Sequence, residues 1–231
     1  MSDRFALVLG GSSDLGAAIV RGLADAGLHV LASGRNAERL ARVGAGREDE
    51  IQTIAADITT AAGQAAVQAL VSERGRLDVL VLGTGIYERS SSPDALTRQF
   101  ASNVLAPYTL LQAFRPLLVA AKGLVVFLNS TQGMSASPGV GQFAATQHAM
   151  RAVADSMRAE VNSLGVAVTS IFLGRTATAR QAAIYAMEQK SYAPEQLIQP
   201  EDVASIVTNL VLLPRTSEVT EVIMRPRTKP S

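Results

Sequence analysis

The sequence predicts an α/β fold with a parallel sheet of about seven strands and helices on both faces. Near-continuous apolar runs recur along the 231 residues, and such runs are typical of strands that are buried on both faces. The segments between these runs are long enough for the crossover helices that parallel strands require. The predicted strands are residues 5–9, 29–33, 51–56, 77–82, 124–129, 166–173 and 218–224.

The chain is predicted to form one domain over residues 1–231, because no linker or shift in composition divides it. One segment, residues 174–199, breaks the alternation of strand and helix. It follows the sixth predicted strand, contains Pro194 and is followed by Pro200. Insertions of this length in compact domains are usually lids or binding loops, so we expect this segment to cover a substrate.

The composition argues against several classes of function. A formal net charge of +1 gives no attraction to nucleic acid or to an anionic membrane. The absence of cysteine excludes disulfides, thiolate nucleophiles and cysteine-ligated metals, and the two histidines give poor support for a histidine-based metal site. The N-terminal apolar run is too short for a signal peptide, and no apolar run is long enough to span a membrane. We therefore expect a soluble, cytoplasmic protein.

A glycine-rich turn, LGGSSDLG, follows the first predicted strand. Gly10 and Gly11 allow a sharp turn and a close approach of the backbone to a ligand. Ser12, Ser13 and Asp14 are preferred N-cap residues, and we expect the Asp14 side chain to cap the helix that follows. The free N–H groups at the start of that helix would face a diphosphate. A turn of this kind can also bind nothing. Its position, in the first βα turn of a doubly wound pattern, favours a dinucleotide.

The end of the second predicted strand indicates which dinucleotide is bound. An acidic residue there would bind the ribose 2′-hydroxyl, but the sequence LASGRN places Arg35 there with no acid nearby. Arginine suits a 2′-phosphate, whereas the alternative is a solvated surface arginine. The sequence therefore predicts NADP(H) rather than NAD(H).

These motifs resemble the short-chain dehydrogenase/reductase family almost from end to end. The TGxxxGxG turn of that family corresponds to residues 9–16, with Asp14 at the middle glycine. The resemblance implies a Rossmann-type fold and a cofactor amide contact from Thr176 or Thr178. The residues that the resemblance and the motifs assign to cofactor binding are Gly10, Ser12, Ser13, Asp14, Leu15, Gly16, Arg35, Asn36, Asp57, Ile58, Gly83, Gly85 and Thr176.

The resemblance also implies a catalytic set that is incomplete here. The catalytic serine corresponds to Ser130 and the helix asparagine to Asn103, but the YxxxK pair falls on Phe143 and Gln147. In the family, the tyrosine delivers the proton and the lysine ammonium favours its phenolate. Phe143 has no hydroxyl and Gln147 has no charge. The loss of a positioned acid typically costs roughly 10²–10⁴ in rate.

Two further expectations concern how a proton could reach the substrate. Pro107 lies four residues after Asn103 in a helical stretch, so the Asn103 carbonyl should lack its helical donor and the helix should bend. This irregularity serves either a water in a proton relay, as in the family, or packing alone. Among substitute acids, Tyr87 after the fourth predicted strand is the best of weak candidates.

The other candidates are less favoured. Tyr185 and Tyr192 lie in the predicted lid and are expected to be ordinary surface residues. His148 is five residues after Phe143, so it should point away from the face that Phe143 occupies.

The favoured function is an NADP(H)-dependent oxidoreductase of a small-molecule carbonyl or alcohol, with an atypical active site. The alternative is a catalytically inactive NADP(H)-binding sensor or partner protein, and a non-redox enzyme that reuses the pocket is a third hypothesis. Residues 94–120 and 141–164 are rich in alanine and leucine. By resemblance to the family, these two helices are expected to pair in a homodimer or homotetramer.

Overall fold

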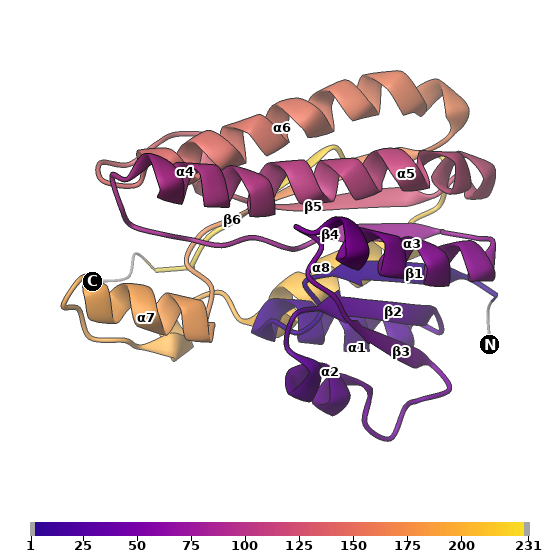
Figure 1. Ribbon diagram of the computed structural model, residues 1–231, viewed down its shortest axis with the longest axis horizontal. Helices are drawn as coiled ribbons and strands as arrows, with labels where there is room; N and C mark the ends of the chain where they lie inside the picture. The colour runs from indigo at the N-terminus through magenta and orange to yellow at the C-terminus, as the bar shows by residue number, and fades with distance from the viewer. Residues whose placement is uncertain (1–2, 229–231) are drawn as a thin grey trace.

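The computed structural model describes residues 3–228. These residues form a sheet of seven parallel strands in the order β3-β2-β1-β4-β5-β6-β7 (Figure 1). The predicted fold class is therefore confirmed. The strands are β1 (Phe5–Leu9), β2 (His29–Gly34), β3 (Ile51–Ala55), β4 (Val79–Leu82), β5 (Leu124–Ser130), β6 (Ala167–Leu173) and β7 (Glu221–Met224).

Helices connect the strands and often begin at capping residues. Asn36, Thr60 and Thr178 each accept a backbone N–H at the start of a helix, which satisfies a donor that the helix itself leaves unpaired. The helices are α1 (Asp14–Asp25), α2 (Ala37–Gly44), α3 (Ala61–Arg74), α4 (Pro93–Phe100), α5 (Ala106–Ala121), α6 (Gly141–Val161), α7 (Ala179–Met187) and α8 (Pro200–Leu212), with a π-helical turn η1 (Ala101–Leu105) and short 3₁₀ turns η2 (Thr131–Gly133), η3 (Asn162–Leu164) and η4 (Pro194–Gln196).

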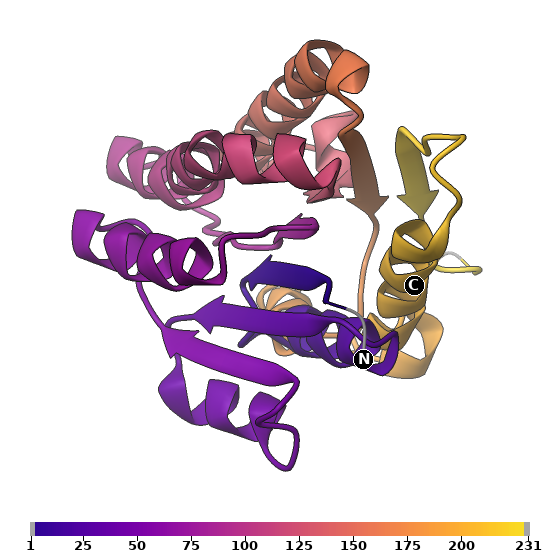
Figure 2. The same cartoon turned by 90° about the vertical axis from the view of Figure 1, so that its right-hand side faces the viewer.

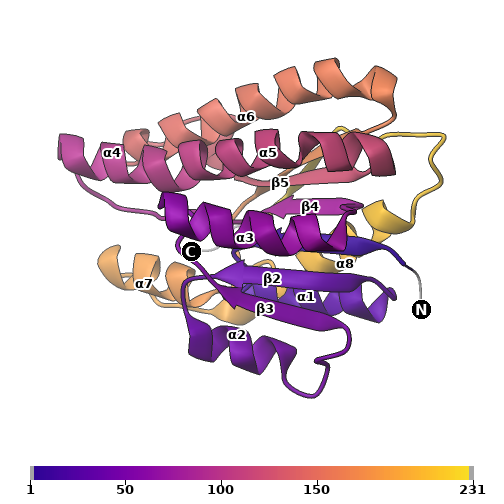
Figure 3. The ribbon, with the colours of Figure 1, turned by 45° about the vertical axis from the view of Figure 1, so that its right-hand side comes forward.

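The sheet is buried on both faces, as the unbroken apolar runs predicted. Along β1, Leu7 and Leu9 pack into a core with α3, α5 and α6. Ala6 and Val8, which point the other way, pack into a second core with α1, α2 and α8. The result is three layers, with α4, α5 and α6 on one side of the sheet and α1 and α8 on the other (Figures 2 and 3).

The helices α1 and α8 pack against each other although they come from opposite ends of the chain (Figure 3). Ile19 and Leu23 of α1 belong to the same buried cluster as Val203 and Val207 of α8. Each of these four side chains is fully removed from solvent. One half of the core is thus completed only when both ends of the chain meet.

The elements α4, η1 and α5 form one helical stretch, Pro93–Ala121, of 29 residues. By length and composition alone it is apolar enough to cross a membrane, and 39% of its most apolar window is buried. Leu110, Phe114 and Leu118 of α5 pack into the core beside the sheet. A core helix passes the same test, so this stretch gives no support for a membrane location.

Candidate active site and cofactor crevice

A crevice of about 480 Å³ lies at the carboxyl edge of the sheet. The strand order reverses between β1 and β4, and ligands of open α/β sheets bind beside such a reversal. The helix α7 stands at the same end of the molecule, outside the layers (Figure 1). Ten of the predicted site residues line the crevice: Ser13, Asp14, Leu15, Gly83, Gly85, Tyr87, Ser130, Phe143, Gln147 and Thr176.

The glycine-rich turn is compact and exposes the start of α1. Gly10 has a φ of +91°, and a Cβ on Gly16 would lie 2.1 Å from the Gly10 carbonyl oxygen, so neither position accepts a side chain. Ser13 caps the helix, because its Oγ accepts the Gly16 N–H at 3.0 Å. The first N–H groups of a helix have no partner within it. Those of Asp14 and Leu15 are therefore available to an anion.

The Asp14 side chain does not cap its own helix, which corrects a sequence expectation. One carboxylate oxygen accepts an Arg39 guanidinium N–H at 2.5 Å. The other accepts the backbone N–H of Ala179 at 2.7 Å. Asp14 thus joins the glycine-rich turn to the first residue of α7, and both of its oxygens have partners.

The remaining predicted cofactor residues lie outside the crevice lining. Arg35 is exposed at the end of β2. Asn36 accepts the Arg39 N–H at 2.8 Å and so caps α2. Hydrogen bonds from the Thr59 hydroxyl and N–H hold the pKa of Asp57 below its usual value. The predicted residues that do not line the crevice are Gly10, Ser12, Gly16, Arg35, Asn36, Asp57, Ile58 and Asn103.

Ser130 ends β5 and lines the crevice. Its Oγ accepts the Gln132 N–H at 3.2 Å. Since a hydroxyl is both donor and acceptor, its hydrogen remains available to a substrate oxygen. Phe143 and Gln147 line the same space from one face of α6.

Tyr87 is the tyrosine that lines this crevice, among residues 3–228. Its ring packs edge-on against Phe143, with the ring centroids 5.2 Å apart and an interplanar angle of 74°. Both side chains line the crevice together with Ser130. A phenol is therefore present beside Phe143 in the crevice.

The other predicted candidates do not line the crevice. Tyr185 is 2% exposed, which corrects its interpretation as a surface residue. It contacts Tyr192 and lies under the Arg175 guanidinium. The Tyr192 hydroxyl donates to the Thr178 carbonyl at 3.4 Å, and desolvation raises the pKa of Tyr192. His148 is exposed, as expected from its position on α6.

The irregularity predicted at Asn103 takes the form of a π-helical turn. The N–H of Ala106 donates to the Ala101 carbonyl, five residues earlier, and such turns are frequent at functional sites. The Asn103 side chain accepts the Ile86 N–H at 2.7 Å and donates to the Thr146 hydroxyl at 3.1 Å. Asn103 thus ties the segment after β4 to α6.

A cavity of about 10 Å³ lies beside this turn, which is about the smallest space that holds one water molecule. Polar side chains that line it are Thr84, Asn103, Asn129 and Gln147. Among the residues described, the Thr84 hydroxyl is buried and has no hydrogen-bond partner. Thr84 lines both this cavity and the larger crevice, so it is a polar group that a bound molecule could satisfy.

Sequence reasoning missed Thr84, Arg39 and Arg180. The Arg180 guanidinium, from the first turn of α7, donates to the Gly85 carbonyl at 2.5 Å and lines the crevice. The only signal for Arg180 was its place in the predicted lid. Nothing in the local sequence pattern shows which lid side chain points inward.

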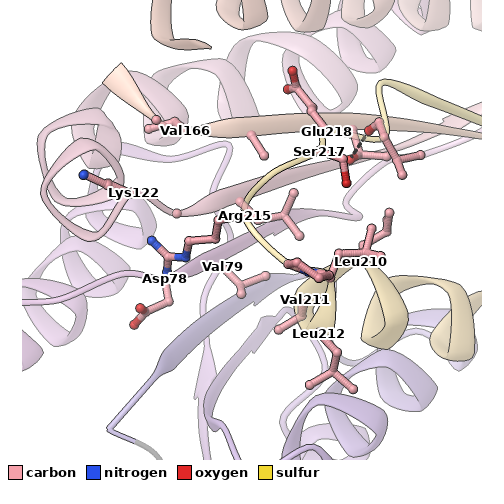
Figure 4. Close-up of a pocket in the computed structure, with 18 of the residues that line it drawn as sticks. Asp78, Val79, Lys122, Val166, Leu210, Val211, Leu212, Arg215, Ser217 and Glu218 are labelled. Carbon is pink, nitrogen blue, oxygen red and sulfur yellow. Dashed lines mark hydrogen bonds between the residues drawn. The ribbon is translucent and has the colours of Figure 1, made fainter. Parts of the chain in front are cut away.

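A second cavity, of about 410 Å³, lies at the amino edge of the sheet. Figure 4 shows it between the end of α8, the following loop and the starts of the central strands, with Asp78, Lys122, Arg215 and Glu218 around it. Both acids are already paired, Asp78 with Arg76 and Glu218 with Asn162. It shares no lining residue with the crevice, so the two are separate.

Several known proteins are similar to this chain over nearly its whole length. An uncharacterized oxidoreductase of Staphylococcus epidermidis is 26% identical over 232 residues, and the match covers 98% of each chain. An alcohol dehydrogenase from the archaeon Thermococcus sibiricus, complexed with 5-hydroxy-NADP, is 25% identical with a TM-score of 0.84, over 99% of each chain. A metagenomic short-chain oxidoreductase in complex with NADP is 27% identical with a TM-score of 0.83, again over 99% of each chain.

The family model described as short chain dehydrogenase matches residues 4–189. This span contains the glycine-rich turn, the π-helical turn and the Ser130 to Gln147 region, and it ends after α7. The chain therefore belongs to the short-chain dehydrogenase family.

Proposed function

We propose that this protein is a cytoplasmic NADP(H)-dependent oxidoreductase, which interconverts a carbonyl and an alcohol on a small molecule at an atypical active site. The observation that carries the proposal is the convergence of Ser130 and Tyr87 on the crevice that begins at the glycine-rich turn. The two similar structures that hold NADP or its 5-hydroxy derivative support the choice of cofactor.

The residues of the crevice fit a dinucleotide. The tight approach of Gly16 to Gly10 leaves the start of α1 open to a diphosphate. The unpartnered Thr84 hydroxyl offers a further polar contact. Arg35, exposed beyond β2, would take the 2′-phosphate. Thr176, 8% exposed in the crevice wall, is the residue proposed for the cofactor amide.

The chemistry requires a hydride at carbon and a proton at oxygen. The bound nicotinamide would supply the hydride. Ser130 donates a hydrogen bond to the substrate oxygen, which stabilises the charge that develops there. We propose Tyr87 as the group that delivers the proton to that oxygen, because its ring contacts Phe143 and no other tyrosine of residues 3–228 lines the crevice.

The second candidate function is a binding protein without turnover. The observation that favours it is the paired replacement of the family acid and its charged neighbour by Phe143 and Gln147. Both functions require NADP(H) binding, so turnover distinguishes them.

Calorimetric titration with NADPH and NADH tests the cofactor. We expect tighter binding of NADPH, and Arg35→Ala should weaken NADPH selectively. Equal or tighter binding of NADH would contradict the assignment.

NADPH oxidation against a panel of ketones and quinones tests turnover. Tyr87→Phe and Ser130→Ala should each lower the rate, by roughly 10²-fold or more for the proposed acid. Tyr108→Phe is the matched control, because Tyr108 is 43% exposed on α5, outside the crevice. Full activity of Tyr87→Phe would exclude Tyr87 as the proton donor, and no turnover on any substrate of the panel would favour the binding protein.

A further inference from the structure

The lid helix is joined to the glycine-rich turn at its first residue. Ala179 begins α7, and its N–H donates to an Asp14 carboxylate oxygen at 2.7 Å. Thr178 caps the same helix by accepting the Gln181 N–H at 3.1 Å. Arg39 holds the other Asp14 oxygen at 2.5 Å. The start of α7 is therefore fixed next to the start of α1.

Arg180, the next residue of α7, extends across the crevice to the segment after β4. Its guanidinium donates to the Gly85 carbonyl at 2.5 Å. Among residues 3–228, no ion pair includes Arg180, so its guanidinium has no carboxylate within ion-pair distance. Asp14 attracts the guanidinium at longer range, whereas Arg35 repels it.

The charge of Arg180 is thus poorly compensated. Although the residue as a whole is exposed, desolvation of its guanidinium in the crevice, and then the repulsion from Arg35, lower its pKa. An anion bound in the crevice would stabilise the charged form. The crevice between the start of α1 and Gly85 is where the diphosphate of a dinucleotide is expected, since the residues at the start of α1 line it.

We infer that Arg180 is a ligand of the cofactor diphosphate, carried on the lid and positioned by Asp14. The inference rests on the proposed NADP(H) function. When the dinucleotide binds, the guanidinium exchanges the Gly85 carbonyl for a phosphate oxygen, and a neutral acceptor is replaced by a charged one. The hydrogen bonds of both Asp14 oxygens, to Arg39 and to Ala179, also explain how a carboxylate is tolerated in this turn.

The test compares two ligands by calorimetry on the full chain. NADPH contains the diphosphate, whereas adenosine 2′-monophosphate contains the adenine, the ribose and the 2′-phosphate without it. Arg180→Gln should weaken NADPH binding roughly ten- to hundred-fold, as expected for a lost charge-assisted hydrogen bond. It should leave the affinity for adenosine 2′-monophosphate unchanged. Arg42→Gln is the control, because Arg42 is an exposed arginine on α2 that pairs with Glu38, and it should change neither affinity.

The outcomes separate this inference from the proposed function. If the wild type binds NADPH and Arg180→Gln binds it equally well, the inference alone is wrong. If Arg180→Gln weakens adenosine 2′-monophosphate to the same extent, Arg180 contacts the 2′-phosphate and the diphosphate assignment is wrong. If the wild type does not bind NADPH, both the proposed function and this inference are wrong. In the Asp14→Ala background, the effect of Arg180→Gln should shrink, because α7 is no longer held; full additivity would contradict the positioning role of Asp14.

Discussion

Phe143→Tyr combined with Gln147→Lys should convert this active site to the usual chemistry of its family. Phe143 is partly buried in the crevice, and Gln147, one turn later on α6, is 8% exposed. Both side chains line the space that Ser130 also reaches. The double variant places a phenol and an ammonium on one helix face beside an intact serine.

The expected gain in turnover combines the benefit of a new general acid with two costs to the stability of the folded protein. A positioned general acid is worth roughly 10²–10⁴ in rate. Replacing Gln147 removes its 3.2 Å hydrogen bond to the Thr146 hydroxyl, which costs about 1 kcal/mol of stability, and it buries an ammonium that is partly compensated by the polar groups of the small cavity. Both costs act on the fraction of protein that is folded rather than on the turnover rate of the folded molecules. Tyr87, the proposed acid of the wild type, has no lysine of residues 3–228 beside it in the crevice lining, so the new pair is expected to be the better acid. Because it replaces a weaker acid rather than none, we expect a rise in turnover of at least about tenfold, below the full range for a positioned acid.

The single variant Phe143→Tyr should gain less than the double variant. Its phenol, with an ordinary pKa of about 10, would lack the ammonium that favours the phenolate. Phe143→Tyr with Gln147→Met is the matched control, because methionine is also unbranched but carries no charge. It should behave like the single variant.

Stopped-flow oxidation of NADPH, in the presence of ketones and quinones, measures these rates, and thermal melting monitors folding. A wild type that turns over briskly, and a well-folded double variant that is slower, would refute the reasoning. Phe143 and Gln147 would then belong to a different mechanism.

The remaining predictions concern the lid, the core and assembly. Asp14→Ala should bind NADPH more weakly than Asp14→Asn, which keeps an acceptor for Ala179; tighter binding by Asp14→Ala would mean that charge repulsion outweighs the lid contact. Asp78 is 4% exposed and accepts the Phe5 N–H at 2.9 Å. Asp78→Ala should therefore lower the free energy of unfolding by about 2–4 kcal/mol in a denaturant titration. The control Asp25→Ala removes an exposed carboxylate and should lower it far less. Light scattering should give a dimer or tetramer formed through α5 and α6, and a species of only 24.2 kDa at micromolar concentration would exclude it.

The fold was predictable from the sequence because burial on both faces leaves unbroken apolar runs. Six of the seven strands begin within two residues of the predicted start, and the exception, β7, begins at Glu221 rather than 218 because Glu218 instead binds Val168 and Asn162. The helical spacing of Phe143 and Gln147 likewise indicated that they share a face. The contacts of α7 with the glycine-rich turn and with Gly85 could not be predicted in this way.

The contacts at the start of α7 depend on residues that are distant in the chain. Asp14 meets Ala179, 165 residues later, and Arg180 meets Gly85, 95 residues earlier. N-cap preferences and periodicity describe only neighbours within an element, so they predicted that Asp14 would cap its own helix. Similarly, they gave no reason to single out Thr84, whose hydroxyl is notable only because the surrounding fold leaves it without a partner.

The pairing of α1 with α8 has a consequence for synthesis of the chain. The ribosome produces Ile19 and Leu23 first, but their apolar partners Val203 and Val207 emerge only near the end of translation. Until then, one apolar face of the nascent sheet stays exposed to solvent and prone to aggregation. The formation of such long-range contacts also slows folding. A nascent chain that stalls before α8 would therefore be a client for chaperones rather than a smaller working domain.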